Sequence, residues 1–349
     1  MKSVSQLEET LQTYFLPQKS RLLLAAFADG TATQDQLAGL THNIQFDNES
    51  SLYLLSLSIL GFQNHWGFFP ASITARLQGL HRYYQVSNSA TAAYLRPIVQ
   101  AWKQADIPVM FSGATALRFG YVADRPRVLR GCDITVPAVF YEKSLDILHR
   151  VSSVSNMPCT GRQPQLRLHA GIPDSRFFNS ELLWQRSFSV PFLDQQIILP
   201  CAQDMLLHLL CIPFGPYAVE EPAVARTQRL LDCIAVLKHS PHLNFQQWTE
   251  QIHTLGLRSV IRFQLATLSK FCPNVLPPQR WESAFPADYE YRQYLREMVQ
   301  LYRSRHFLEK YRRPLLHPVS YGWYRWQFHQ AKHRILQQIK NKHHYNYEP

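Results

Sequence analysis

The hydrophobic positions at the start of the chain repeat with the spacing of an α-helix. Leu7 and Leu11 fall on one face of a first helix, as residues four apart do. A longer helix is predicted over residues 88–104, and Pro97 is expected either to kink this helix or to mark its first turn. Residues 1–105 are therefore predicted to form a helical N-terminal region.

The pattern changes near residue 106 to the alternation that is typical of β-strands. A first short strand over residues 107–111 ends in a turn of small residues, 112–117, which opens a short helix. An amphipathic helix is predicted over residues 141–151. Further strands are predicted over residues 132–136, 165–169, 187–191 and 196–199. Together these elements predict a small mixed β-sheet.

From residue 200 onward the pattern is helical again, with helices predicted over residues 204–211, 223–239, 245–255 and 257–271. The proline-rich segment 272–286 is interpreted as a linker, and two basic helices are predicted near residues 289–311 and 321–342. The chain is thus expected to be an α+β protein. Its expected parts are a helical N-terminal region (1–105), an α/β core (106–200), a helical domain that completes a cleft (201–275) and basic C-terminal helices (276–349).

Composition and cysteine usage exclude several classes of protein. The 349 residues are 46% hydrophobic, which is enough for a sizeable core. No run approaches the ~18 apolar residues of a transmembrane helix, and the N-terminus lacks the apolar segment of a secretory signal. Six cysteines without a C-x-x-C pair exclude a zinc ribbon and favour a reducing, cytoplasmic location. Cys211 and Cys233 lie in apolar runs and are expected in the core.

The net charge of +11 is unevenly distributed and suggests an anionic partner. Residues 290–349 hold 12 Lys and Arg against 4 Asp and Glu, a net charge of +8, whereas residues 1–289 hold 24 against 21, a net charge of +3. Three interpretations of the basic C-terminal helices stay open. They bind nucleic acid, they lie on an anionic membrane, or they pack against the core with their charges facing solvent.

The middle of the chain holds the candidate site. The small-residue turn that follows the first strand leaves the backbone amides of Ser112 and Gly113 bare at the start of a helix, where such amides hold a phosphate. Asp133 lies on the next predicted strand and could bind the Mg²⁺ that accompanies that phosphate. The simpler interpretations are a tight strand-to-helix turn and a structural aspartate.

This arrangement resembles the DNA polymerase β-like nucleotidyltransferase superfamily, and residues from about 75 to 275 are similar to a bacterial family of uncharacterised nucleotidyltransferases. The matching stretches are 111–117 (Phe-Ser-Gly-Ala-Thr-Ala-Leu), 130–136 (Arg-Gly-Cys-Asp-Ile-Thr-Val), 166–169 (Leu-Arg-Leu-His), 200–209 and 229–235. The resemblance implies a nucleotidyltransferase core that moves a nucleoside monophosphate from an NTP, with Mg²⁺, to an unknown small-molecule, peptide or protein acceptor. It implies that Asp133 is the catalytic metal ligand. The further residues that it implies at the nucleotide are Ser112, Gly113, Thr115, Arg130, Arg167 and His169.

The sequence departs from the family at its carboxylates. The family strand reads Asp-x-Asp, and side chains two apart on a strand point to the same side, but here Thr135 stands at the second position. Arg167 stands near the place of a third carboxylate. Either Glu142, Asp146 or Asp194 supplies a replacement, or the site is degenerate and Asp133 pairs with Arg167. The alternatives for individual residues are a packed core role or a substrate contact for His169, and a structural role for His208.

Three hypotheses of function follow. The first is a nucleotidyltransferase with a degenerate metal site, in which Arg125, Arg127 and Arg130 of one loop clamp the triphosphate. The second is a catalytically inactive nucleotidyltransferase-like protein that binds a nucleotide or a partner as an accessory of a biosynthetic cluster. The third is an anionic-polymer binder that acts through its C-terminal helices.

Overall fold

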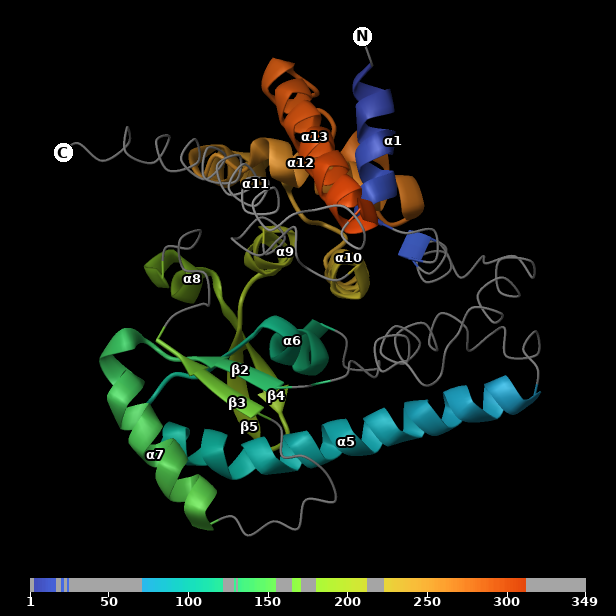
Figure 1. The fold of residues 1–349 in the computed structure, drawn as a ribbon. Helices are drawn as coiled ribbons and strands as arrows, with labels where there is room; N and C mark the ends of the chain where they lie inside the picture. The colour runs from blue at the N-terminus through green and yellow to red at the C-terminus, as the bar shows by residue number, and fades with distance from the viewer. Residues whose placement is uncertain are drawn as a thin grey trace, which may run out of the picture. The chain divides into compact units, whose positions relative to one another are not determined.

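The structure is a computed structural model (Figure 1). It describes residues 3–16, 20–21, 24, 71–121, 129, 131–154, 165–170, 180–211 and 223–311. Contacts between Cα atoms divide the chain into two compact units. One unit comprises Met1–Arg21, Leu210–Thr227 and Asn244–Pro349, and the other comprises Leu22–Leu209 and Gln228–Leu243.

A five-stranded mixed sheet forms the centre of the second unit, so the predicted α+β class is confirmed. Its strands are β1 (Met110–Ser112), β2 (Gly131–Thr135), β3 (Gln165–His169), β4 (Phe188–Phe192) and β5 (Gln195–Leu199), in the spatial order β3-β2-β1-β5-β4. β1 runs antiparallel to β2 and parallel to β5. β2 and β3 are parallel, while β4 and β5 form an antiparallel hairpin. All five strands were predicted to within a few residues.

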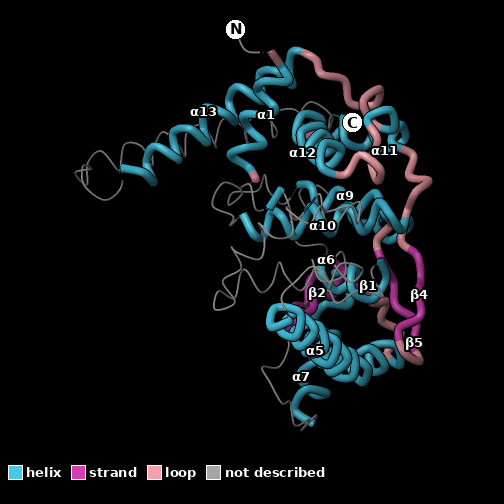
Figure 2. The backbone as a smooth tube through the Cα atoms, turned by 90° about the vertical axis from the view of Figure 1, so that its right-hand side faces the viewer, coloured by secondary structure: helices cyan, strands magenta, loops and turns pink. Residues whose placement is uncertain are grey.

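Helices lie on both faces of this sheet (Figures 1 and 2). The helices of this part of the chain are α5 (Ala71–Gln104), α6 (Gly113–Ala116), η2 (Leu117–Tyr121), η3 (Ala138–Phe140), α7 (Tyr141–Val154), α8 (Ser180–Arg186), α9 (Ala202–Cys211) and α10 (Ala223–His239). α5 and α7 pack together across one face, where the Trp102 indole donates a hydrogen bond of 3.0 Å to the carbonyl of Ser144. α6 covers β1 and β2 on the other face.

The α5 helix is longer than the predicted helix, and it contains Pro97 in its interior. The first-turn interpretation of this proline is therefore wrong. Proline removes one hydrogen bond from the helix, here the bond to the carbonyl of Ala93. The neighbouring side chains of Leu95 and Ile98 are fully buried, so packing against the rest of the unit stabilises the helix at this point.

An aromatic cluster anchors the segment that follows α6. The rings of Phe111, Phe119 and Phe192 lie 4.9–5.8 Å apart in tilted or edge-on arrangements. Gly120 lets this segment approach β5, because a Cβ atom there would lie only 1.8 Å from the Leu199 side chain. The backbone of η2 is thereby fixed against the sheet.

The other unit is built from helices alone in its described part. They are α1 (Val4–Phe15), α11 (Phe245–Thr254), α12 (Arg258–Phe271), the short η6 (Pro278–Arg280) and α13 (Tyr289–Tyr311). A capping box of Ser3 and Gln6 starts α1, and α1 then packs along α13. The Tyr291 hydroxyl donates a hydrogen bond of 2.7 Å to the Glu8 carboxylate across this contact. The predicted bounds of the helix over 289–311 are confirmed.

The proline-rich segment 272–286 is a packed part of this unit, so its interpretation as a linker is wrong. Leu276, Trp281 and Phe285 are buried. The guanidinium of Arg262 lies over the Trp281 ring, 5.3 Å from its centroid, and donates a hydrogen bond to the carbonyl of Phe285. Large apolar side chains among the prolines thus fold the segment back onto α12.

Several predictions fall outside the described residues. These are the helix near residues 321–342, the arginine loop with Arg125, Arg127 and Arg130, and the side chain of Cys211. Cys233 is buried as expected. Within the described part of the chain, no helix combines the length and the apolar character that crossing a membrane requires.

Candidate functional site

The register of three neighbouring strands brings the predicted polar residues to one face of the sheet. Ser112 of β1 lies opposite Asp133 of β2, and Asp133 lies opposite Arg167 of β3. Thr135 and His169 are the next pair on the same face, since side chains two residues apart on a strand point to the same side. Alternation predicts which residues of one strand share a face, and the pairing of the three strands then brings these residues together.

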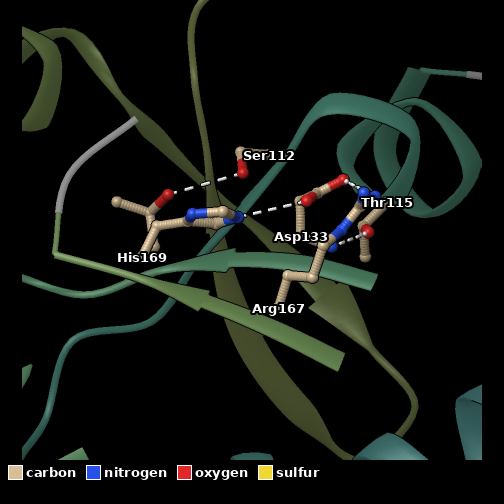
Figure 3. A network of polar contacts seen from close by, with 6 residues as sticks. Ser112, Thr115, Asp133, Arg167 and His169 are labelled. Carbon is tan, nitrogen blue, oxygen red and sulfur yellow. Dashed lines mark hydrogen bonds and ion pairs between the residues drawn. The ribbon is translucent and has the colours of Figure 1, made fainter. Parts of the chain in front are cut away.

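Asp133 is the centre of the resulting network (Figure 3). Its Oδ2 accepts a hydrogen bond of 2.9 Å from Nη2 of Arg167, and its Oδ1 lies 3.1 Å from Nε2 of His169. An ionised carboxylate only accepts, so this histidine nitrogen carries the proton. The side chain of Asp133 is 15% exposed, that of His169 is 25% exposed and that of Arg167 is 51% exposed. The predicted ion pair is confirmed, and His169 is not a fully packed core residue.

The surroundings of Asp133 keep it ionised. Burial raises the pKa of its carboxyl group, but the hydrogen bond from His169 and the charge of Arg167 outweigh burial and hold the pKa below its usual value. Asp133 is therefore an anion at neutral pH, and its charge is balanced within the network.

Three buried hydroxyl groups support the site, those of Thr115, Thr135 and Ser112. The Thr115 hydroxyl accepts a hydrogen bond of 2.8 Å from the backbone N–H of Asp133, and Thr115 has no exposed surface. Thr115 thus positions Asp133, and its hydroxyl is already engaged there. The Thr135 hydroxyl lies 3.4 Å from that of Ser112, and both side chains are buried. The Ser112 side chain therefore contributes to the sheet, and its backbone amide remains the group predicted to contact a phosphate.

Gly113 lies beside this network, with room for a methyl group in ordinary van der Waals contact. Its φ of +52° lies in the left-handed region that favours glycine. A Cβ atom at this position would lie 3.4 Å from Oδ2 of Asp133 and 3.8 Å from Nε2 of His208. His208 of α9, interpreted from the sequence as a structural histidine, therefore lies beside the site. Its signals in the sequence were a polar residue inside an apolar helix and the similarity of the stretch 200–209 to the family, and neither identified it as a site residue.

The donors at this face do not fit the Mg²⁺ that the resemblance implies. Mg²⁺ prefers several oxygen ligands in nearly octahedral geometry. The network offers one carboxylate, and Arg167 and His169 engage both of its oxygens. Thr135 supplies only a buried neutral hydroxyl group. In the described residues, moreover, no group of three or more His, Cys, Asp or Glu residues could hold a metal ion.

The alternative sources of a carboxylate do not change this result. Glu142 and Asp146 lie on α7, and Asp194 lies in the turn between β4 and β5, where it pairs with Arg96. None of the three is part of a potential metal-binding group within the described chain. Arg130, which was predicted to steady a triphosphate, lies outside the described residues, so its role stays a prediction.

The arrangement is instead suited to an anion. A guanidinium group has five N–H donors, and the contact with Asp133 uses the Nη2 of Arg167, whose side chain is half exposed. The His169 imidazole lies at the other oxygen of Asp133, and Nε2 of His208 lies close to Gly113. Guanidinium and imidazole groups around a small-residue turn are the ligands that phosphate oxygens prefer.

The chain was compared with family models, with curated proteins and with solved structures, and none of these three comparisons found a match.

Proposed function

We propose that this chain is a nucleotidyltransferase-like protein that binds a nucleoside triphosphate at the Asp133 network without transferring its nucleotidyl group. In this proposal Arg167 contacts the phosphates, His169 holds Asp133 in place, and the backbone at Gly113 lets a phosphate approach the sheet. The resemblance of residues from about 75 to 275 to nucleotidyltransferases supports the choice of a nucleotide among phosphate compounds.

The observation that carries the proposal is the engagement of both Asp133 oxygens by Arg167 and His169. A carboxylate that is neutralised by a guanidinium group positions that group, and it no longer repels a phosphate. The same engagement withdraws the carboxylate from the acid–base and metal chemistry that transfer requires.

The experiment is a titration of purified protein with ATP, GTP, CTP and UTP by isothermal calorimetry, followed by an assay for pyrophosphate release. We expect saturable binding of at least one nucleotide and no pyrophosphate above the level of the Asp133→Ala variant. Absence of binding by all four nucleotides would contradict the proposal.

Nucleotidyl transfer to an unknown acceptor is the second candidate function, and one observation favours it. Asp133 is ionised and partly exposed at the phosphate-binding face, which is the state that a catalytic carboxylate needs. Pyrophosphate release or self-labelling with a nucleotide, both lost in Asp133→Ala, would decide for this candidate and against binding alone.

A further inference from the structure

Arg167 occupies a position at which its charge acts directly on Asp133. The two residues are Cα partners in the parallel pair of β2 and β3, so their side chains extend side by side from the sheet. The distance of 2.9 Å between Nη2 and Oδ2 is that of a charge-assisted hydrogen bond. The arginine is half exposed, while the carboxylate is largely buried, so the cationic group is the more accessible of the two.

A divalent cation at Asp133 would meet this guanidinium group. Mg²⁺ binds carboxylate oxygens at about 2.1 Å, so an ion on Oδ2 would lie no more than about 5 Å from Nη2 of Arg167. Two cations at that distance repel each other strongly in a partly buried site. On the other carboxylate oxygen, the ion would displace the hydrogen bond from His169.

We infer that the Arg167 guanidinium takes the place of a divalent cation at this site, so that nucleotide phosphates bind to the chain without Mg²⁺. The inference deepens the proposed function and rests on it. Asp133 is then a positioning residue for Arg167 and His169. The positive charge that a metal ion would bring to the phosphates comes from the side chain, which is always charged.

The surface pair of Arg96 and Asp194 provides a matched control. Nη2 of Arg96 lies 2.7 Å from the Asp194 carboxylate, and its side chain is 54% exposed, close to the 51% of Arg167. Asp194 lies in the turn between β4 and β5, away from the three strands that carry the network. Removal of either arginine breaks one ion pair of a half-exposed arginine, with Asp194 47% exposed and Asp133 15% exposed. Only Arg167→Met removes a ligand of the proposed phosphate site.

The test measures ATP binding by calorimetry in EDTA and in MgCl₂, for the wild type and for Arg167→Met, Arg167→Lys and Arg96→Met. We expect the wild-type dissociation constants in EDTA and in MgCl₂ to agree within about threefold. Because hydrogen bonds to charged groups contribute about 1.5–3 kcal/mol, Arg167→Met should weaken binding by about tenfold or more. Arg167→Lys should retain part of the affinity, and Arg96→Met should bind as the wild type does.

Two results would overturn the inference while the proposed function stands. The first is that the wild type binds ATP only in MgCl₂. The second is that Arg167→Met binds ATP more strongly than the wild type and also binds Mn²⁺ without nucleotide, as measured by electron paramagnetic resonance. Absence of ATP binding in every buffer would overturn the proposed function and the inference with it. Circular dichroism of Arg167→Met, compared with Arg96→Met, separates a loss of affinity from a loss of folding.

Discussion

Substitution of Gly113 by alanine changes two quantities that can be measured separately, the stability of the fold and the affinity for ATP. The φ of +52° is a left-handed conformation, which costs an alanine about 1–2 kcal/mol. Alanine regains about 0.4–1 kcal/mol by restricting the unfolded chain. The added Cβ clashes with nothing, because Asp133 and His208 lie 3.4 and 3.8 Å away. We therefore expect a net loss of about 1 kcal/mol in the free energy of unfolding.

The methyl group has a second consequence, since it fills the space beside Asp133 and His208. A phosphate oxygen can no longer approach the backbone there, so ATP affinity should fall by at least tenfold, which is about 1.4 kcal/mol of binding free energy. The loss of affinity is thus expected to be larger than the small loss of stability can explain, because a variant that is about 1 kcal/mol less stable remains almost entirely folded.

Gly256 supplies the control for this experiment. It has a φ of +66° and ends α11 in a Schellman motif, with bonds from Gly256 N to the carbonyl of His253 and from Leu257 N to the carbonyl of Ile252. Gly256→Ala should lose about as much stability as Gly113→Ala but keep its ATP affinity. Unfolding in urea measures the stabilities, and calorimetry measures the affinities. Unchanged ATP affinity in Gly113→Ala, or an equal loss of affinity in both variants, would show that the phosphates do not bind beside Gly113.

Three further predictions follow from the structure. Gly120→Ala should destabilise the protein by about 1–3 kcal/mol in urea unfolding, because its Cβ would overlap the buried side chain of Leu199. A substitution that leaves the free energy of unfolding unchanged would contradict the close approach of η2 to β5. The pKa of Asp133 is lower in the folded state, so its ionised carboxylate stabilises the fold at pH values above the unfolded pKa of about 3.9, and this contribution is lost as the pH falls through the folded pKa. Asp133→Asn should therefore lose less stability than the wild type on acidification below about pH 4. Parallel stability profiles of the two proteins in acid would count against this role of Asp133. Burial raises the pKa of Cys132 to about 12, so this thiol should resist iodoacetamide at pH 8 in the folded protein and react after unfolding in urea; rapid alkylation in the native state would be inconsistent with its position.

Local patterns were sufficient for most of the regular elements. The strand over Gln165–His169 was predicted with its observed bounds, because the alternation of polar and apolar residues is uninterrupted there. Alternation puts Asp133 on one face with Thr135, and Arg167 on one face with His169, and the ion pair follows from the parallel pairing of β2 and β3. This pairing joins segments more than thirty residues apart, and no local signal specifies it.

Tertiary packing decided the places where the predictions were wrong. The prolines of segment 272–286 indicated a linker, but Trp281 and Phe285 find buried positions against α12 that composition does not reveal. Pro97 is tolerated inside α5 because the apolar neighbours of this residue are buried. His208 joins the site only because α9 lies next to the turn at Gly113, which depends on the arrangement of whole elements.

The most direct test of the account is a crystal structure of the protein grown with ATP and EDTA. We expect phosphate oxygens within hydrogen-bond distance of the Arg167 guanidinium, beside Gly113, with Asp133 still bonded to Arg167. A nucleotide bound at a different part of the chain, or an Arg167 side chain turned away from bound phosphates, would contradict it.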